Sequence, residues 1–243
     1  ALSGTPISLV SLYIIFTVIS WPGMILNSEL FTIIRAKIDL VDGSILELTE
    51  SIIPVNGLLK AELFEVKENE LLIFEDANVQ VYAFNVPHGP IHGSVGYKII
   101  SGDRSVVISG DTDVMDSYDF INGVDVLIHE AIIEPVSTAV SQSAKRLGNE
   151  RISEIFNDIN DYHANLIDYE DNPGLLSRLE GIELGLLALI HIIPDKDNII
   201  VKRALKKFSS QSSHDVVVAE INMIISLPLN TKEITIKWAL SIV

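Results

Sequence analysis

The feature that most constrains the fold is the apolar run at residues 184–190, Leu-Gly-Leu-Leu-Ala-Leu-Ile, which contains no polar or charged side chain. A strand without alternation of polar and apolar side chains is typical of a sheet that is covered on both faces. The run therefore predicts a buried strand inside a layered domain rather than a strand at a solvent-exposed face.

Other segments extend this pattern. Residues 96–100 and 105–109 are β-branched runs on either side of Ser-Gly-Asp-Arg, which predicts a hairpin. Residues 137–160 and 199–208 predict helices, and a short helix is expected at 114–121. Further strands are expected at residues 71–74, 79–86, 124–128, 216–219 and 223–227. Strands mixed with helices predict an α/β domain in layers, with the helices outside.

Composition excludes several classes of protein. The 243 residues include 33 acidic and 17 basic side chains, a formal charge of −16, and such a surface repels the phosphates of nucleic acids. A content of 48% apolar and 21% charged residues excludes a disordered or low-complexity chain. The absence of cysteine excludes a disulfide framework, a thiolate metal site and a cysteine nucleophile.

The N-terminal segment is uncharged as far as residue 28. Residues 7–26 have roughly the length of a membrane span, which needs about 20 apolar residues. Pro22-Gly23 interrupts the segment and no basic residue precedes it, so buried strands or a core helix are favoured over a membrane anchor. A cytoplasmic location is accordingly favoured, with export or anchoring as alternatives. Because the first residue is Ala1, we expect either a processed N-terminus or a piece of a longer chain.

Polar side chains of a particular kind stand at the predicted strand ends. His88, His129 and His191 each end an apolar run, and Asp111 follows the run at 105–109. Imidazoles with a carboxylate are natural ligands for zinc. Taken one at a time, each residue also has a structural interpretation: a single histidine at a strand end is more often structural, and Gly110-Asp111-Thr112 is typical of a tight turn. His129-Glu130 can be read as a surface pair, and His214, among serines, as a solvated loop residue.

The order of these segments resembles the metallo-β-lactamase superfamily, and within it the ribonuclease Z-like branch of metal-dependent hydrolases. The likeness covers residues 70–236, and residues 1–69 are a divergent or truncated N-terminal part of a single domain over 1–243. It is carried by Val-Pro-His-Gly-Pro at 86–90, Gly-Tyr-Lys-Ile at 96–99, Ser-Gly-Asp-Thr at 109–112, Leu-Ile-His-Glu-Ala at 127–131, Asp-Tyr-His at 161–163 and Ile-His-Ile-Ile-Pro at 190–194.

The resemblance implies an αββα sandwich with a dinuclear zinc site at one edge. His88 and His191 would each be a ligand of one metal, and Asp111 would bridge the two. His163 would match the catalytic histidine that donates a hydrogen bond or a proton to the leaving group. In the pair His129-Glu130, the resemblance places Glu130 behind the ligands, where it orients a ligand histidine.

One departure from the family pattern is clear. The motif His-x-His-x-Asp-His is absent from all 243 residues, and the position expected for it, at 11–17, reads Ser-Leu-Tyr-Ile-Ile-Phe-Thr. The cofactor is therefore expected to be one or two zinc ions, bound weakly or lost. His92, four residues after His88 in a Gly/Pro loop, is a candidate replacement ligand.

The function that the resemblance implies is metal-dependent hydrolysis of a phosphodiester or related ester, with a water molecule activated by the metal. The alternative is an inactive homologue that serves as a binding or assembly scaffold. A small ester is the expected substrate, because the charge of −16 and the lack of a long basic insertion argue against a large RNA. The apolar N-terminal segment would cover surface left by the altered half, either in the same chain or across a homodimer.

Overall fold

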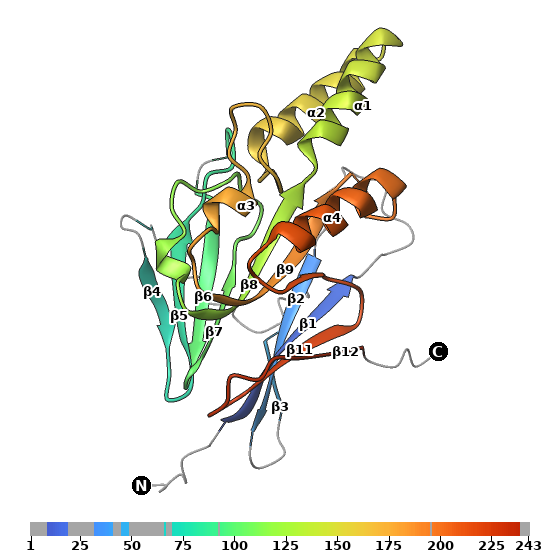
Figure 1. Ribbon diagram of the computed structural model, residues 1–243. Helices are drawn as coiled ribbons and strands as arrows, with labels where there is room; N and C mark the ends of the chain where they lie inside the picture. The colour runs from blue at the N-terminus through green and yellow to red at the C-terminus, as the bar shows by residue number, and fades with distance from the viewer. Residues whose placement is uncertain are drawn as a thin grey trace, which may run out of the picture.

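The computed structural model describes residues 66, 70–91, 93–194 and 196–238, together with the backbone of three strands at residues 9–18, 32–40 and 45–48. Two sheets form its centre (Figure 1). The larger, seven-stranded sheet has the order β10-β9-β8-β7-β6-β5-β4. Its strands are β4 (Leu71–Glu75), β5 (Gln80–Asn85), β6 (Val95–Ser101), β7 (Arg104–Ile108), β8 (Val124–Ile132), β9 (Leu184–Ile193) and β10 (Val216–Val218).

The smaller, five-stranded sheet has the order β12-β11-β1-β2-β3, and all of its neighbouring strands are antiparallel. Its strands are β1 (Leu9–Val18), β2 (Thr32–Leu40), β3 (Ile45–Leu48), β11 (Met223–Pro228) and β12 (Thr235–Trp238). The segment expected to be either strands or a core helix therefore contains a strand, which pairs with β2 on one side and β11 on the other. None of the helices in the described ranges is long and apolar enough to cross a membrane.

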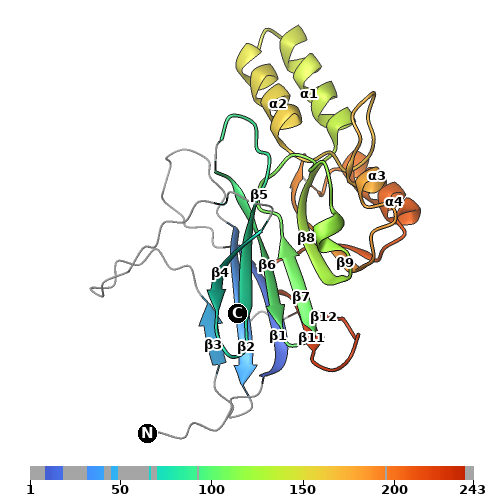
Figure 2. The ribbon, with the colours of Figure 1, turned by 90° about the vertical axis from the view of Figure 1, so that its left-hand side faces the viewer.

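The central strands β8 and β9 of the seven-stranded sheet are buried on both faces, as the run at 184–190 predicts. One face packs against the five-stranded sheet, where Val126, Ile128 and Ala188 meet Ile225 and Leu227 of β11. The other face packs against helices α3 (Leu175–Arg178) and α4 (Ile199–Gln211), mainly through Leu175, Val201 and Phe208. The predicted layered α/β architecture is confirmed. In the described part of the chain the helical cover lies on the seven-stranded sheet, and no helix covers the outer face of the five-stranded one (Figures 1 and 2).

Two helices, α1 (Glu134–Arg146) and α2 (Glu150–Tyr162), project from the body as an antiparallel hairpin (Figure 2). The single helical segment expected at 137–160 is therefore two helices. Gly148 separates them at φ 75°, a left-handed conformation that glycine adopts without cost and that commonly ends a helix. Asn149 then starts α2, because its side chain accepts a hydrogen bond from the Ile152 amide at 3.2 Å.

The prediction of a short helix at 114–121 is mostly wrong, since only a 3-10 turn, η1 (Asp119–Ile121), is formed there. The predicted strands at 71–74, 79–86, 96–100, 105–109 and 124–128 are found with small changes of their bounds. His92 lies outside the described residues, as does most of the segment 1–69.

Candidate metal centre

Four strand ends meet at one edge of the seven-stranded sheet. β5 and β7 are each antiparallel to β6 and so run in the same direction, and β7, β8 and β9 are parallel to one another. Their carboxyl ends lie together at the edge where side chains converge in open α/β sheets. His88 follows β5, Asp111 follows β7, Glu130 lies near the end of β8 and His191 near the end of β9.

Glu130 is the centre of this group. Its side chain is fully buried, and its Oε2 accepts hydrogen bonds from His163 Nδ1 at 2.7 Å and from His191 Nδ1 at 3.1 Å. Its Oε1 accepts a hydrogen bond from the Thr112 amide. Burial alone would raise the pKa of Glu130, but these hydrogen bonds hold that pKa below its usual value. The carboxylate is therefore ionised and is shared by two histidines.

His191 occupies a β-bulge. Glu130 pairs with Ile190 and Ala131 with Ile192, so His191 is left out of the ladder, with φ 46°. A bulge re-aims the side chain of the extra residue, and here the imidazole is directed at the carboxylates of Glu130 and Asp111. Hydrogen bonds to Asp111 (3.2 Å) and to Glu130 raise the pKa of His191 to about 10, and the bond to His191 lowers the pKa of Asp111.

His88 is oriented by the backbone of the neighbouring segment. Its Nδ1–H donates to the Tyr162 carbonyl at 3.0 Å, which leaves Nε2 as the free acceptor. The loop that carries it is tied to the Asp111 loop, because the Asp113 amide and the Thr112 hydroxyl both donate to the Pro87 carbonyl. Fixing one ring nitrogen of a histidine in this way is typical of metal-ligating imidazoles.

His163 is positioned by the end of α2. Its amide donates to the Ile159 carbonyl as the helix closes, and its backbone is then extended. The next residues join the edge of the site: the Ala164 amide donates to the Thr112 carbonyl at 2.8 Å, and the Ile132 amide donates to the Ala164 carbonyl. The α1–α2 hairpin therefore sets the position of His163 beside Glu130.

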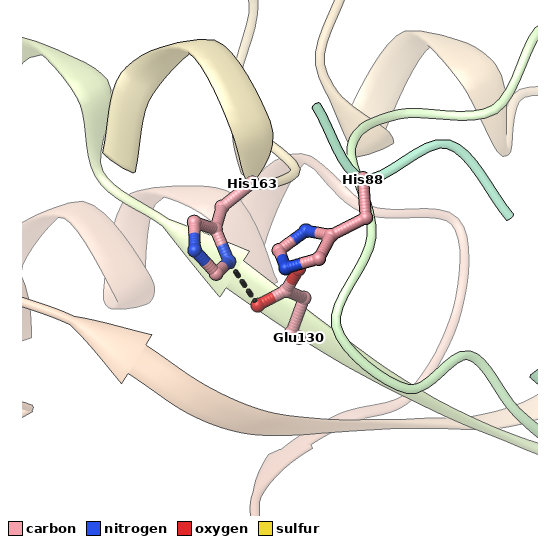
Figure 3. Close-up of side chains that lie close together, drawn as sticks. All are labelled: His88, Glu130 and His163. Atoms are coloured by element: carbon pink, nitrogen blue, oxygen red, sulfur yellow. Dashed lines mark hydrogen bonds and ion pairs between the residues drawn. The ribbon is translucent and has the colours of Figure 1, made fainter. Parts of the chain in front are cut away.

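The cluster offers two sets of three metal-ligating side chains, which share Glu130. One is His88, Glu130 and His163; the other is Asp111, Glu130 and His191. Within each set the ligand atoms lie within 4.8 Å of one another. Figure 3 shows the first set, with the His88 and His163 rings on either side of the Glu130 carboxylate. Ring centroids are 5.0 Å apart for His88 and His163, and 5.5 Å apart for His163 and His191.

The residues expected at the site are therefore in one cluster, except for His129. Along β8 successive side chains point to opposite faces, so His129 points away from Glu130. Its Nδ1–H donates to the Glu130 carbonyl, its Nε2 accepts from the Tyr118 hydroxyl at 2.9 Å, and burial lowers its pKa. His214 lies elsewhere and contacts the Leu179 carbonyl.

Glu130, which the resemblance places behind the ligands as a group that orients a ligand histidine, contacts both His163 and His191. A signal for its burial was present: Glu130 follows the predicted buried strand at 124–128, and a buried carboxylate needs charged or hydrogen-bonding partners.

Comparison with known proteins finds partial likenesses in sequence and in structure. No family model matches the sequence. Ribonuclease Z of Mycobacterium tuberculosis and of Mycobacterium bovis are each 30% identical to it over 108 residues, which is 44% of this chain. The aligned segment spans 33% and 32% of those proteins, about a third of their length.

Three solved structures show partial likeness to this chain. The metallo-β-lactamase fold protein YhfI from Bacillus subtilis aligns with a TM-score of 0.46 at 18% identity, over 69% of this chain and 56% of its own. Human tRNase Z, short form, aligns with a TM-score of 0.39 at 20% identity, over 66% of this chain and 48% of its own. Zinc-bound PqqB from Methylobacterium extorquens aligns with a TM-score of 0.41 at 18% identity, over 62% of this chain and 51% of its own. The sequence likeness to ribonuclease Z over these 108 residues agrees with the resemblance that the motifs predict.

Proposed function

We propose that the protein is a metal-dependent hydrolase that cleaves a small phosphodiester or a related ester. The observation that carries this proposal is the convergence of three imidazoles and two carboxylates on one edge of the sheet, around the buried Glu130. Imidazole nitrogens and carboxylate oxygens are the donors that zinc and similar divalent ions take in proteins. The residues present therefore fit an ion even without the His-x-His-x-Asp-His motif.

A bound divalent ion supplies a water molecule of lowered pKa and polarises the ester oxygen. The chain's own residues do the rest. Glu130 and His88 would be among the ligands of the ion. The Thr112 amide donates a hydrogen bond to Glu130, and His88 donates one to the Tyr162 carbonyl, so both side chains are held in place. The Asp111–His191 pair is part-exposed, so it is accessible to a substrate and able to hold or donate a proton at its edge.

A cavity beside the cluster supports a small substrate. The loops that carry His88 and Asp111 also line a hollow of about 900 Å³, in which Phe84 and Phe120 provide apolar surface. Asp113, Asp116 and Asp119 make its lining acidic. A polyanion such as a long RNA would be repelled there, whereas an aromatic or aliphatic leaving group of a singly charged ester would be accepted.

The test is to measure zinc content and hydrolysis of a chromogenic phosphodiester together. We expect the wild-type protein to hold zinc in stoichiometric amounts and to turn over the ester, and Glu130→Gln to lose both. His214→Gln is the matched control, because His214 is a part-buried histidine outside the cluster, and it should retain both properties.

His191→Ala provides a second variant in case Glu130→Gln disturbs folding, since the side chain of His191 is one-third exposed. It should lose turnover while its circular dichroism stays that of the wild type. Absence of both zinc and turnover in the wild-type protein would reject the hydrolase and favour the alternative, a homologue that uses the same edge only for binding.

A further inference from the structure

We propose that one side of α2 binds an alkyl or acyl chain of the substrate, so that the ester cleaved at this edge of the sheet is a small amphiphile. This inference rests on the proposed function and names the class of substrate for the same site. The surface consists of Ile152, Ile155, Phe156, Ile159 and Tyr162, and we call it the α2 stripe.

The α2 stripe is a continuous apolar surface along the helix. Its members recur at intervals of three and four residues, which is the spacing of neighbours on one face of a helix. Ile152 and Ile155 are 36% and 42% exposed, and the other three side chains are half-buried. A contiguous apolar surface that is open to solvent commonly marks a place where an apolar group binds.

The α2 stripe does not face α1. The contacts between the two helices are polar, since the Ser141 hydroxyl meets the Ser153 hydroxyl and the Asn157 side chain. Ser153 and Asn157 each follow a member of the stripe by one position, which is a rotation of about 100° around the helix axis. An amphipathic helix normally packs its apolar side against its neighbour, so here that side is left for another contact.

The α2 stripe leads directly into the metal centre. His163 follows Tyr162 at the end of α2, and His88 donates a hydrogen bond to the Tyr162 carbonyl at 3.0 Å. The Tyr162 ring packs against Gly89, where an added Cβ would lie only 2.1 Å from the ring atom Cδ1. From this point the helix extends away from the body (Figure 2). A molecule held at the cluster therefore has an apolar surface beside it that continues outward.

The dimensions of the α2 stripe suit a single chain rather than a protein. Ile152 and Tyr162 are ten residues apart, which is about 15 Å along a helix, the length of an extended chain of about twelve carbons. A strip about 15 Å long and 10 Å wide offers roughly 150 Å², whereas a stable protein interface buries about 800 Å² on each partner. The formal charge of −16 also makes two copies of the chain repel each other.

The two groups of a phosphodiester then have separate surfaces. Residues 85–87 line the acidic cavity, and the next two residues of the same loop, His88 and Gly89, contact the end of α2. In this arrangement the leaving group lies in the cavity, and the alkyl group that stays on the phosphate lies along the α2 stripe.

The test compares p-nitrophenyl butyl phosphate with p-nitrophenyl decyl phosphate, each below its critical micelle concentration, as substrates of the whole chain supplied with zinc. A chain that lies on an open surface buries about half of each methylene, which corresponds to about a twofold gain in affinity for each one added. We therefore expect KM for the decyl ester to be roughly 50-fold lower than KM for the butyl ester.

The double variant Ile152→Gln/Ile155→Gln replaces two exposed members of the α2 stripe by polar side chains that are compatible with a helix. It should reduce the ratio of the two KM values to less than about fivefold. Glu154→Gln is the matched control, because Glu154 is an exposed residue between the two isoleucines on another side of the same helix, and the ratio should stay that of the wild type.

Binding of butylphosphonate and decylphosphonate, measured by isothermal titration calorimetry, gives a readout that needs no turnover. We expect decylphosphonate to bind more tightly to the wild type, and the double variant to lose most of this difference. Chain-length-dependent binding without turnover would reject the hydrolase and retain the α2 stripe as a binding surface.

Two results would overturn the inference. Turnover with the same KM for both esters would remove the α2 stripe from the substrate site and leave the hydrolase intact. A wild type that sediments as a dimer and a double variant that sediments as a monomer, with no effect of chain length in either, would assign the α2 stripe to a second copy of the chain.

Discussion

Glu130 is a single buried carboxylate that contacts several groups of the site. It accepts hydrogen bonds from His163, His191 and the Thr112 amide, and these contacts compensate for its removal from water. It lies near the carboxyl end of β8, so its side chain meets the loops that carry His163 and Thr112 and the end of β9 that carries His191 at the sheet edge. The chemistry of the site therefore depends on the face to which residue 130 points.

At the same scale, the His191 ion pairs make the stability of the metal-free protein depend on pH. The folded-state pKa of His191, about 10, lies above its ordinary value of 6.5, so the stabilisation is complete below pH 6.5 and is lost as the pH rises towards 10. We expect the free energy of unfolding of the metal-free wild type to fall between about pH 6 and about pH 10, measured by urea denaturation.

His191→Gln is the control for this pH dependence, because glutamine keeps a hydrogen-bond donor and does not titrate. Its unfolding free energy should fall less over the same interval. Parallel curves for the two proteins would show that the His191 ion pairs do not contribute to the pH dependence.

At the scale of elements, the α1–α2 hairpin positions His163, and polar contacts hold the hairpin together. Ser141 is buried, and its hydroxyl contacts the Ser153 hydroxyl at 3.0 Å and the Asn157 side-chain oxygen at 2.7 Å. We expect Ser141→Ala to lower the free energy of unfolding by about 1–3 kcal/mol, because it leaves the buried Ser153 hydroxyl without this hydrogen bond.

Ser143→Ala is the matched control, two residues along the same helix, where the hydroxyl is part-exposed and donates to the Ala139 carbonyl. It should change the unfolding free energy by less than about 0.5 kcal/mol. Equal effects of the two substitutions in chemical denaturation would mean that the serine contacts between α1 and α2 are not stabilising.

Some features of these elements could be predicted from the sequence and others could not. The apolar run at 184–190 was sufficient to predict a strand buried on both faces, because burial removes the alternation of side chains. The break at Gly148 was missed, because the residues on both sides of it favour helix. The bulge at His191 was missed too, because it results from pairing with β8, a long-range contact that local pattern does not encode.

At the scale of the whole molecule, the buried Arg104 links the seven-stranded sheet to the segment between β11 and β12, at the end remote from the metal cluster. Arg104, at the start of β7, is fully buried and lies 3.2 Å from Asp125 of β8. Its guanidinium also donates to the carbonyls of Thr231 and Glu233, in the segment between β11 and β12. The five-stranded sheet is thereby fastened to the seven-stranded one.

We expect Arg104→Ala to lower the free energy of unfolding by about 3–5 kcal/mol, the usual cost of leaving one member of a buried pair alone. Zinc affinity of the folded fraction should be unchanged, since Arg104 lies at the opposite end of β7 from Asp111. Lys232→Ala is the control: its side chain is 79% exposed and 3.8 Å from the same carboxylate, so its loss should cost less than about 1 kcal/mol. A small effect of Arg104→Ala in denaturant titration would contradict the role of the pair.

The most direct test of the central claim is anomalous diffraction at the zinc absorption edge from crystals of the wild-type protein grown with zinc. We expect an anomalous peak within about 2.0–2.2 Å of the Glu130 carboxylate and of the imidazoles beside it. Crystals saturated with zinc in which Glu130 is bonded only to His163 and His191, with no peak at this edge of the sheet, would contradict it.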